Sequence, residues 1–494
     1  MATTSVIPTA MELLLDTVPD EIWEKILAHF IRDRDTLQAV IGAACSAHDQ
    51  APRLHWQIAH DQALRLYWQN ETCEKELLEE LEDHQPNTQQ QSLADLMRNV
   101  VTDFKAPHAH HEARGLQFPR LQSLTVQHGK AELRGETRTF ARVARFVRDR
   151  LRHLEIGDSL DGRPGLLPIV DNFLPKLSKC KGLRLLKLYA RLTRRTTSED
   201  LVAVLQRCTR LETLHLESLV DDLINESVMG CIALHPAIEE LELEKRFDQP
   251  FALSIVAVAH PFQKLRHLVL FADAAAANIL LPCITQLERL ELTVDGTASV
   301  FPYLRGLKNL WSIWLKFTHY TLSDNDLAYL VLLKRLKYLE LTSTHDGERL
   351  DATLLNADPF ATVLGSLPAL VSRNLNATNN LGDPFLLALG RQCRILRDLT
   401  LTGTFTLEPL ATEPTVLFPC LLSLRLGSLS PSVPIRQLSF FREFWADQRA
   451  QDVLRHAPLV SWFDCCQDDD DVYGKLAEEA WKKLKSDGDV YVGG

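Results

Sequence analysis

A short apolar pattern, Leu-x-x-Leu-x-Leu, recurs along most of this 494-residue chain. Matches begin at residues 121, 151, 183, 211, 238, 265, 287, 310, 336, 396 and 421, and weaker matches begin at 370 and 459. Successive starts from 121 to 336 differ by 22 to 32 residues, a step that chance matches in a leucine-rich chain would not keep. This spacing indicates a repeat unit made of one short strand and one returning segment.

The repeat predicts how the units pack. One such strand cannot bury its own leucines, whereas stacked neighbouring units bury them in a continuous core. The segments "SEDLVAVLQRC" and "DPFLLALGRQC" begin with polar residues or proline and place apolar residues at helical spacing, and "FLPKLSKC" also reads as a helix. The sequence therefore predicts an α/β solenoid, with parallel strands on the concave face and helices on the convex face.

Three of these segments end in a cysteine three residues before the strand leucine, at Cys180, Cys208 and Cys393. Free cysteine is among the most buried residue types, and no histidine or lysine pattern supports a reactive thiol, so we expect small buried residues at helix-to-strand corners. The chain has ten cysteines and no Cys-x-x-Cys pair, which gives a structural zinc site little support and favours a reducing compartment over a disulfide framework.

These repeats resemble the leucine-rich-repeat family in its ribonuclease-inhibitor-like form, over about residues 116–464. The family usually places Asn or Cys three residues after the last leucine, and here Asp or Thr can make similar bonds to the backbone. That position holds Leu219, Asp273, Asp295, Thr344 and Thr404. Interruptions that contain proline and glycine, near 157–168 and 343–369, predict longer loops.

A separate amphipathic helix is predicted over residues 17–30, "TVPDEIWEKILAHF". Pro19 suits the first turn of a helix, where its missing N–H costs nothing. The apolar face comprises Ile22, Trp23, Ile26, Leu27 and Phe30. A second apolar set follows over 37–45, and so small a unit would gain much from a partner.

The run "VPDEIWEKILAHF…DTLQAVIGAACS" resembles an F-box over about residues 14–58, with Val18 where that family has leucine. It keeps Pro19, Glu21, Ile22, Ile26, Leu27, Leu37 and Cys45. An F-box followed by leucine-rich repeats implies a substrate-recognition subunit of an SCF-type ubiquitin ligase. The resemblance implies docking on the SKP linker of a cullin–RING ligase through Pro19, Ile22, Trp23, Ile26 and Leu27, and capture of a protein substrate by the solenoid.

Such a subunit is not an enzyme and needs no cofactor, because it contributes proximity between a substrate lysine and a charged E2 enzyme. Two other functions stay open. The first is a protein-interaction scaffold without ligase engagement, in which residues 17–45 cap the solenoid. The second is a GTPase activator of the leucine-rich type. The latter needs a catalytic arginine and asparagine, and we identify no convincing pair in the sequence.

The remaining segments complete the expected domain order. Residues 59–115 are predicted to be a helical linker, in which 74–101 reads as helix, flexible joint and helix. Residues 465–494 are predicted to be an acidic tail with a short helix, in which Asp468–Asp471 solubilises the chain.

Residues 137–154 read as a convex amphipathic helix with a solvated basic face; an acidic partner is the alternative. That face comprises Arg138, Arg142, Arg145 and Arg152.

The concave face offers one candidate substrate site. The hexamer "LWSIWL" places Trp311 and Trp314 outward, the next strand adds Tyr338, and Glu291 and Glu340 flank them. Exposed aromatic side chains of this kind are typical of binding hot spots. We expect a substrate segment with apolar anchors and basic flanks. The alternative is that the rings pack against a loop such as 343–369 or turn inward.

The net charge and the hydropathy of the chain limit the classes of partner that it can bind. A net charge of −11 disfavours general binding to nucleic acid or to an anionic membrane. The longest apolar stretch, 251–259, falls far short of the ~18 residues that a membrane span needs. The N-terminal residues do not read as a signal peptide, so we expect a cytoplasmic or nuclear protein.

His108, His110 and His111 lack companion ligands, which favours a solvated linker over a metal site.

Overall fold

The computed structural model describes most of the repeat region. The described residues are 99–103, 120–127, 147–157, 173–189, 196–216, 223–344, 349–432, 439–465 and 471–489. They belong to two compact units, Met1–Leu211 and Glu212–Gly494. The F-box-like segment 14–58 lies outside the described residues.

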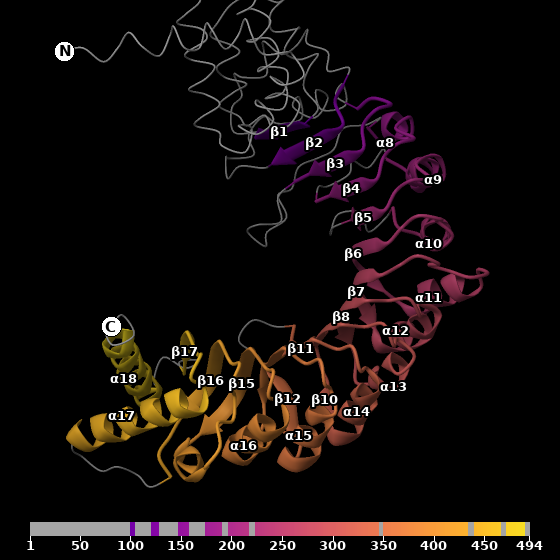
Figure 1. Ribbon diagram of the computed structural model, residues 1–494. Helices are drawn as coiled ribbons and strands as arrows, with labels where there is room; N and C mark the ends of the chain where they lie inside the picture. The colour runs from indigo at the N-terminus through magenta and orange to yellow at the C-terminus, as the bar shows by residue number, and fades with distance from the viewer. Residues whose placement is uncertain are drawn as a thin grey trace, which may run out of the picture. The chain divides into compact units, whose positions relative to one another are not determined.

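The first unit contains four strands and two helices in its described part (Figure 1). These elements are β1 (Asn99–Asp103), β2 (Ser123–Gln127), β3 (His153–Ile156), α8 (Phe173–Leu177), β4 (Leu185–Leu188) and α9 (Ser198–Arg207). The strands are hydrogen-bonded in chain order, and every pair is parallel. Leu124, Leu154 and Leu186 share one register position and are fully buried.

The second unit continues the alternation of strands and returning segments. Its first half comprises β5 (Thr213–Leu216), α10 (Glu226–Ala233), β6 (Glu240–Phe247), α11 (Gln249–Val256), β7 (His267–Asp273), α12 (Ala274–Leu280), η2 (Leu281–Cys283), β8 (Arg289–Asp295), α13 (Phe301–Leu304), β9 (Ser312–Phe317), β10 (Thr321–Ser323), α14 (Asp324–Ala328) and η3 (Tyr329–Leu332). Its second half comprises β11 (Tyr338–Ser343), β12 (Leu350–Leu354), α15 (Ala357–Gly365), β13 (Ser372–Leu375), β14 (Ala377–Thr378), α16 (Gly382–Gln392), β15 (Asp398–Phe405), η4 (Glu408–Thr412), β16 (Ser423–Leu429), α17 (Ser439–His456), β17 (Trp462–Asp464) and α18 (Val472–Asp489).

The main sheet of the second unit is parallel and runs in the order β5-β6-β7-β8-β9-β11-β13-β15-β16-β17. A smaller parallel sheet joins β10, β12 and β14. Helices α10 to α16 lie along one face of the main sheet, where the returning segments were expected (Figure 1). The predicted solenoid of parallel strands and returning helices is therefore confirmed.

The leucines of the pattern set the register of this sheet. One apolar row runs through Leu214, Leu241, Leu268, Leu290, Ile313 and Leu339, and a second runs through Leu216, Leu243, Leu270, Leu292, Leu315 and Leu341. Every residue in these two rows is at most 3% exposed. Burying one leucine side chain contributes roughly 1.5–3 kcal/mol, so a slip of one residue, which would expose a whole row, is strongly disfavoured.

Polar residues cap the N-termini of several helices. Thr197 and Asp200 form a capping box on α9, and Asp273 accepts a hydrogen bond from the amide of Ala276 to cap α12. Asp273 thus makes the expected bond to the backbone. Asp295 and Thr404 bond instead to side chains of neighbouring units, at Thr318 and Ser428.

The three corner cysteines are buried as predicted. Cys180 and Cys208 are 0% exposed and Cys393 is 5% exposed. Cys208 and Cys393 are the C-cap residues of α9 and α16. Burial raises the pKa of the Cys180 thiol to about 12 and the pKa values of the other two to about 11, so all three remain protonated and unreactive.

The C-terminal helix belongs to the folded core. The ring of Trp481 on α18 packs edge-on against Phe463 of β17 at 6.0 Å between centroids, and both residues are buried. The Asp471 carboxylate accepts hydrogen bonds from the amides of Leu429 and Gly474, both at 2.9 Å. The segment 465–494 thus contains helix α18, which covers the last strands of the sheet, and Asp471 is a structural residue.

Four expectations about local structure are wrong. The sequence predicted a helix that extends to Val101, but strand β1 begins at Asn99. This strand pairs with β2. The loop expected over 343–369 contains β12 and α15. Arg152 directly precedes strand β3 instead of lying on a helix. The repeat read from Leu459 begins one residue later, because Leu459 is exposed and Val460 is buried.

Arg373 is a charged residue in the apolar core of the second unit. Its register position lies between those of Leu339 and Leu399, and it is 1% exposed. The guanidinium lies 4.3 Å from the ring centroid of Phe360 and 4.8 Å from that of Phe385. Its two terminal nitrogens have no hydrogen-bond partner among the described residues, and burial lowers its pKa to about 9. The two rings compensate only part of the cost of removing a charge from water.

We expect Arg373→Leu to stabilise the chain, because leucine restores the apolar row and removes an unpaired buried charge. The expected gain in the free energy of unfolding is about 1–3 kcal/mol, which raises Tm by a few degrees. Thermal unfolding followed by circular dichroism measures the change. Arg335→Leu, at an exposed position, is the control and should change little. A lower Tm for Arg373→Leu would contradict this account of the core.

Candidate partner-binding site

The register of four neighbouring strands brings the predicted site residues together. Glu291 of β8, Trp314 of β9 and Glu340 of β11 pair in one row, and Asn374 of β13 continues it. The residues on either side of Glu291, Trp314 and Glu340 are buried and apolar, and those on either side of Asn374 are buried as well, so the row lies on the face opposite the leucines. Tyr338 lies two residues before Glu340 and is 43% exposed.

Trp311 and Tyr338 form an aromatic pair at the start of the strands. Their ring centroids are 5.7 Å apart and the rings are at 72°, an edge-to-face arrangement. The Trp311 amide donates to the carbonyl of Glu288 at 2.9 Å, and the amide of Tyr338 donates to the Trp311 carbonyl at 3.1 Å. The backbone ladder therefore fixes the positions from which both rings project, and the half-exposed Tyr338 ring presents an apolar surface to solvent.

Trp314 is half-buried and is held by a cation. The Lys316 ammonium lies 4.1 Å from the centroid of the Trp314 ring and 3.1 Å from Oε1 of Glu291. The indole N–H is buried and has no acceptor among the described residues, so the ring carbons are the part of the side chain available for contact. Because Lys316 pairs with Glu291, that carboxylate is already neutralised by the chain itself.

Glu340 carries the remaining acidic character of the row beside Trp314. Its Oε1 accepts a hydrogen bond from Nδ2 of Asn374 at 3.0 Å. Burial raises the pKa of Glu340 and nearby Glu291 adds to the rise, while the Asn374 bond and Lys316 oppose it. A partly desolvated carboxylate of this kind attracts a cationic group more strongly than a fully hydrated one.

A second acidic cluster lies in the same row of outward residues. His215 of β5 is 5% exposed and lies between two glutamates, with Nε2 3.3 Å from Glu240 and Nδ1 3.0 Å from Glu242. The sequence analysis did not predict this contact. His215 and Glu242 share one register position in adjacent strands and Glu240 lies two residues before Glu242, which is the signal that would have revealed the cluster.

Other predicted sites fall outside the described residues or find no counterpart within them. Pro19, Ile22, Trp23, Ile26 and Leu27, together with the histidines at 108, 110 and 111, lie outside the described residues. Within the described part of the chain, no group of three His, Cys, Asp or Glu side chains could hold a metal ion. No described helix has the length and apolar character needed to cross a membrane.

No family model matches the chain, and none of the curated proteins matches it. Among solved structures, a leucine-rich-repeat protein of Leptospira interrogans is 14% identical, with a TM-score of 0.43, over 77% of this chain and 81% of that one. A chain of the yeast Rad7–Elc1 complex is also 14% identical, with a TM-score of 0.35, over 95% and 94%.

The raised pKa of Glu340 predicts a pH-dependent effect of Glu340→Gln. Because the charged carboxylate is disfavoured in the folded chain, ionisation of Glu340 lowers the free energy of unfolding. This destabilisation is absent below the usual pKa of 4.5 and develops as pH rises through the folded-state pKa. Glutamine still accepts the Asn374 bond. We expect the variant to be slightly more stable than wild type at pH 7 and equally stable near pH 4.

Urea unfolding at both pH values, followed by circular dichroism, measures this difference. Glu239→Gln, at an exposed position, is the control for removing one acidic group. A Glu340→Gln variant that is less stable than wild type at pH 7 would show that the carboxylate is instead favoured in the folded chain.

Proposed function

We propose that this protein is the substrate-recognition subunit of an SCF-type ubiquitin ligase. In this proposal, the F-box-like segment 14–58 docks on the SKP linker of a cullin–RING ligase, and the solenoid binds the protein to be ubiquitinated. The observation that carries the proposal is the order of the two parts: an F-box-like sequence precedes a solenoid of parallel strands. A parallel-strand solenoid presents an extended surface for a protein partner.

The row around Trp314 is the proposed substrate surface. Trp311, Trp314 and Tyr338 supply aromatic area of the type that anchors protein partners. Their backbones are fixed by the strand ladder, so binding orders few side chains and loses little conformational entropy.

The charges around these rings refine the substrate class. Lys316 already pairs with Glu291, so a basic residue of the substrate would face Glu340 instead. The proposed substrate segment therefore carries an apolar side chain for the Trp311–Tyr338 pair and one nearby lysine or arginine. The protein itself performs no covalent step and holds the substrate near the E2 enzyme.

Docking on the SKP linker is tested by affinity capture of the full chain. We expect the wild type to bring down the SKP linker and the double variant Pro19→Ala/Ile22→Ala to lose it, because both side chains belong to the proposed docking face. Trp314→Ala is the matched control and should retain the linker. A wild-type chain that captures no linker would leave the protein as an interaction scaffold outside the ligase.

Substrate binding is tested by quantitative comparison of the captured proteins. We expect Trp314→Ala or Tyr338→Ala to weaken substrate binding about 30-fold, the loss typical of an aromatic hot spot. Trp462→Ala removes a tryptophan that is 58% exposed on β17 and is the matched control. Circular dichroism checks that each variant is folded. If substrates stay bound to both site variants, the Trp314 surface is not the binding site.

A further inference from the structure

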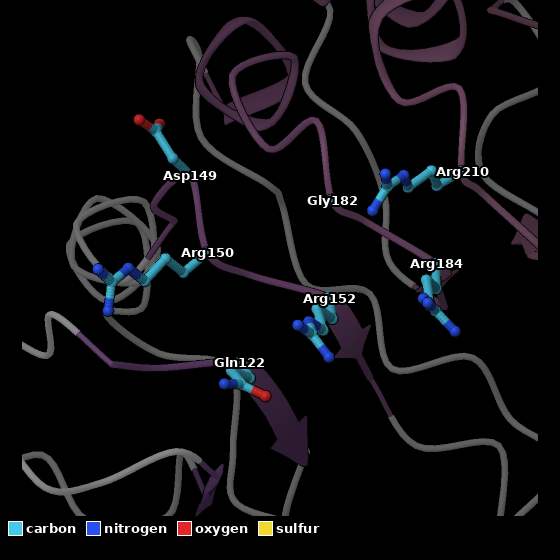
Figure 2. A pocket seen from close by; sticks show the side chains of 7 residues that line it. All are labelled: Gln122, Asp149, Arg150, Arg152, Gly182, Arg184 and Arg210. Carbon is cyan, nitrogen blue, oxygen red and sulfur yellow. The ribbon is translucent and has the colours of Figure 1, made fainter.

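A hollow of about 360 Å³ in the first unit is lined by four arginines (Figure 2). These are Arg150, Arg152, Arg184 and Arg210. Gln122, Asp149 and Gly182 complete the lining. All four arginines are exposed, so the hollow is open to solvent.

Three equivalent turns form one side of the hollow. Each is closed by a backbone hydrogen bond from the first leucine of the repeat to the residue three positions earlier. These bonds join Leu151 to Arg148 at 3.0 Å, Leu183 to Cys180 at 2.9 Å and Leu211 to Cys208 at 2.9 Å. Arg150, Gly182 and Arg210 therefore hold the same position in successive turns.

The corner cysteines stack these turns on one another. The Cys180 thiol donates to the carbonyl of Arg148 at 3.0 Å, and the Cys208 thiol donates to the carbonyl of Cys180 at 3.4 Å. Each thiol thus links its own turn to the turn of the preceding repeat. This fixes the spacing of the backbone that carries Arg150 and Arg210.

The residues that follow the first leucine of three successive repeats, Leu121, Leu151 and Leu183, form the second side. The amide of Arg152 donates to the carbonyl of Gln122, and the amide of Arg184 donates to that of Arg152, each at 2.7 Å. Neighbouring strands lie about 4.8 Å apart, so these side chains leave the backbone at regular short intervals. Two rows of arginines therefore border one hollow.

Gly182 leaves the hollow open between the turns. It lies in the row between Arg150 and Arg210, and a Cβ atom added there would meet nothing within 4 Å. Its backbone conformation is one that other residues adopt, since its φ is not in the left-handed region. The space above Gly182 is thus available to a ligand, and a larger side chain would fill it without backbone strain.

Three of the four arginines in the hollow have no carboxylate paired with them among the described residues. Arg150, Arg152 and Arg210 form no ion pair with any described residue, and Asp149 is the one carboxylate in the lining. By contrast, Arg266 of the second unit holds the same repeat position as Arg152 and pairs with Glu288 at 3.2 Å. A cluster of exposed arginines in a chain of net charge −11 indicates a specific anion site.

We propose that this hollow binds a phosphate monoester carried by a protein segment, namely a phosphoserine or phosphothreonine side chain. Guanidinium groups donate paired hydrogen bonds that match phosphate oxygens. The lining offers no aromatic ring on which a nucleobase could stack, and the acidic chain as a whole repels a polynucleotide. The site is separate from the Trp314 surface and does not require the proposed ligase role.

The test measures binding of fluorescent peptides to the purified full chain by fluorescence anisotropy. The probes are a peptide library with phosphoserine fixed at its centre and the same library with serine there. Inorganic phosphate and an oligothymidylate are the competitors. We expect at least tenfold tighter binding of the phosphorylated library and competition by phosphate.

Three variants test the geometry of the hollow. Arg152→Gln and Arg210→Gln should each weaken binding of the phosphorylated library about tenfold, the loss expected for hydrogen bonds to a charged group. Gly182→Glu should abolish binding, because its carboxylate would occupy the hollow. Lys181→Gln removes an equal charge from the same turn outside the lining and should change affinity less than twofold.

Circular dichroism confirms that each variant is folded, and Gly182→Glu tests the site without removing any arginine. Equal affinity for the two libraries would overturn the proposal, as would undiminished binding by Gly182→Glu. An oligothymidylate that binds more tightly than the phosphorylated library would assign the hollow to nucleic acid instead. None of these measurements involves the SKP linker, so they succeed or fail independently of the proposed ligase role.

Discussion

Burial of the repeated leucines between neighbouring parallel strands is the interaction on which the rest of this structure depends. A strand of three to eight residues cannot bury its apolar side alone, and each unit obtains that burial from the units before and after it. Because the leucines must align, the register of every strand pair is set. The alignment then decides which polar residues become neighbours on the opposite face.

That constraint gives the two units surfaces of different chemistry. In the second unit, the row through Glu291, Trp314 and Glu340 combines aromatic rings with carboxylates. In the first unit, the residues that flank the first leucine of each repeat gather four arginines around Gly182. Neither surface is needed to bury the leucines, so the repeat leaves these positions available for partner recognition.

The sequence predicted the repeats well because leucine spacing reports burial directly. It predicted the helix ending at Cys208 and the outward placement of Trp314 for the same reason. It failed where tertiary pairing overrides local pattern. Residues 99–101 look helical in isolation, yet they belong to strand β1 because β2 offers a partner. Lys316 is two residues from Trp314, but its contact with Glu291 depends on the register between β8 and β9.

The arginine hollow was missed for a related reason. Its residues are scattered from 122 to 210, and the sequence assigned Arg152 to a helix. Comparing equivalent positions across repeats shows the signal: Arg150, Gly182 and Arg210 precede the leucine, and Gln122, Arg152 and Arg184 follow it. In a stacked repeat, such positions are neighbours in space even though they are about 30 residues apart in the chain.

Arg373 affects the way in which the second unit unfolds. In a stack whose units contact only their neighbours, the free energy of each interface decides whether adjacent blocks unfold together. An unpaired guanidinium between the rows of Leu339 and Leu399 weakens one such interface without breaking the backbone ladder on either side. Cooperativity is therefore reduced at that interface, and the repeats before β13 can lose their structure in a separate step from those after it.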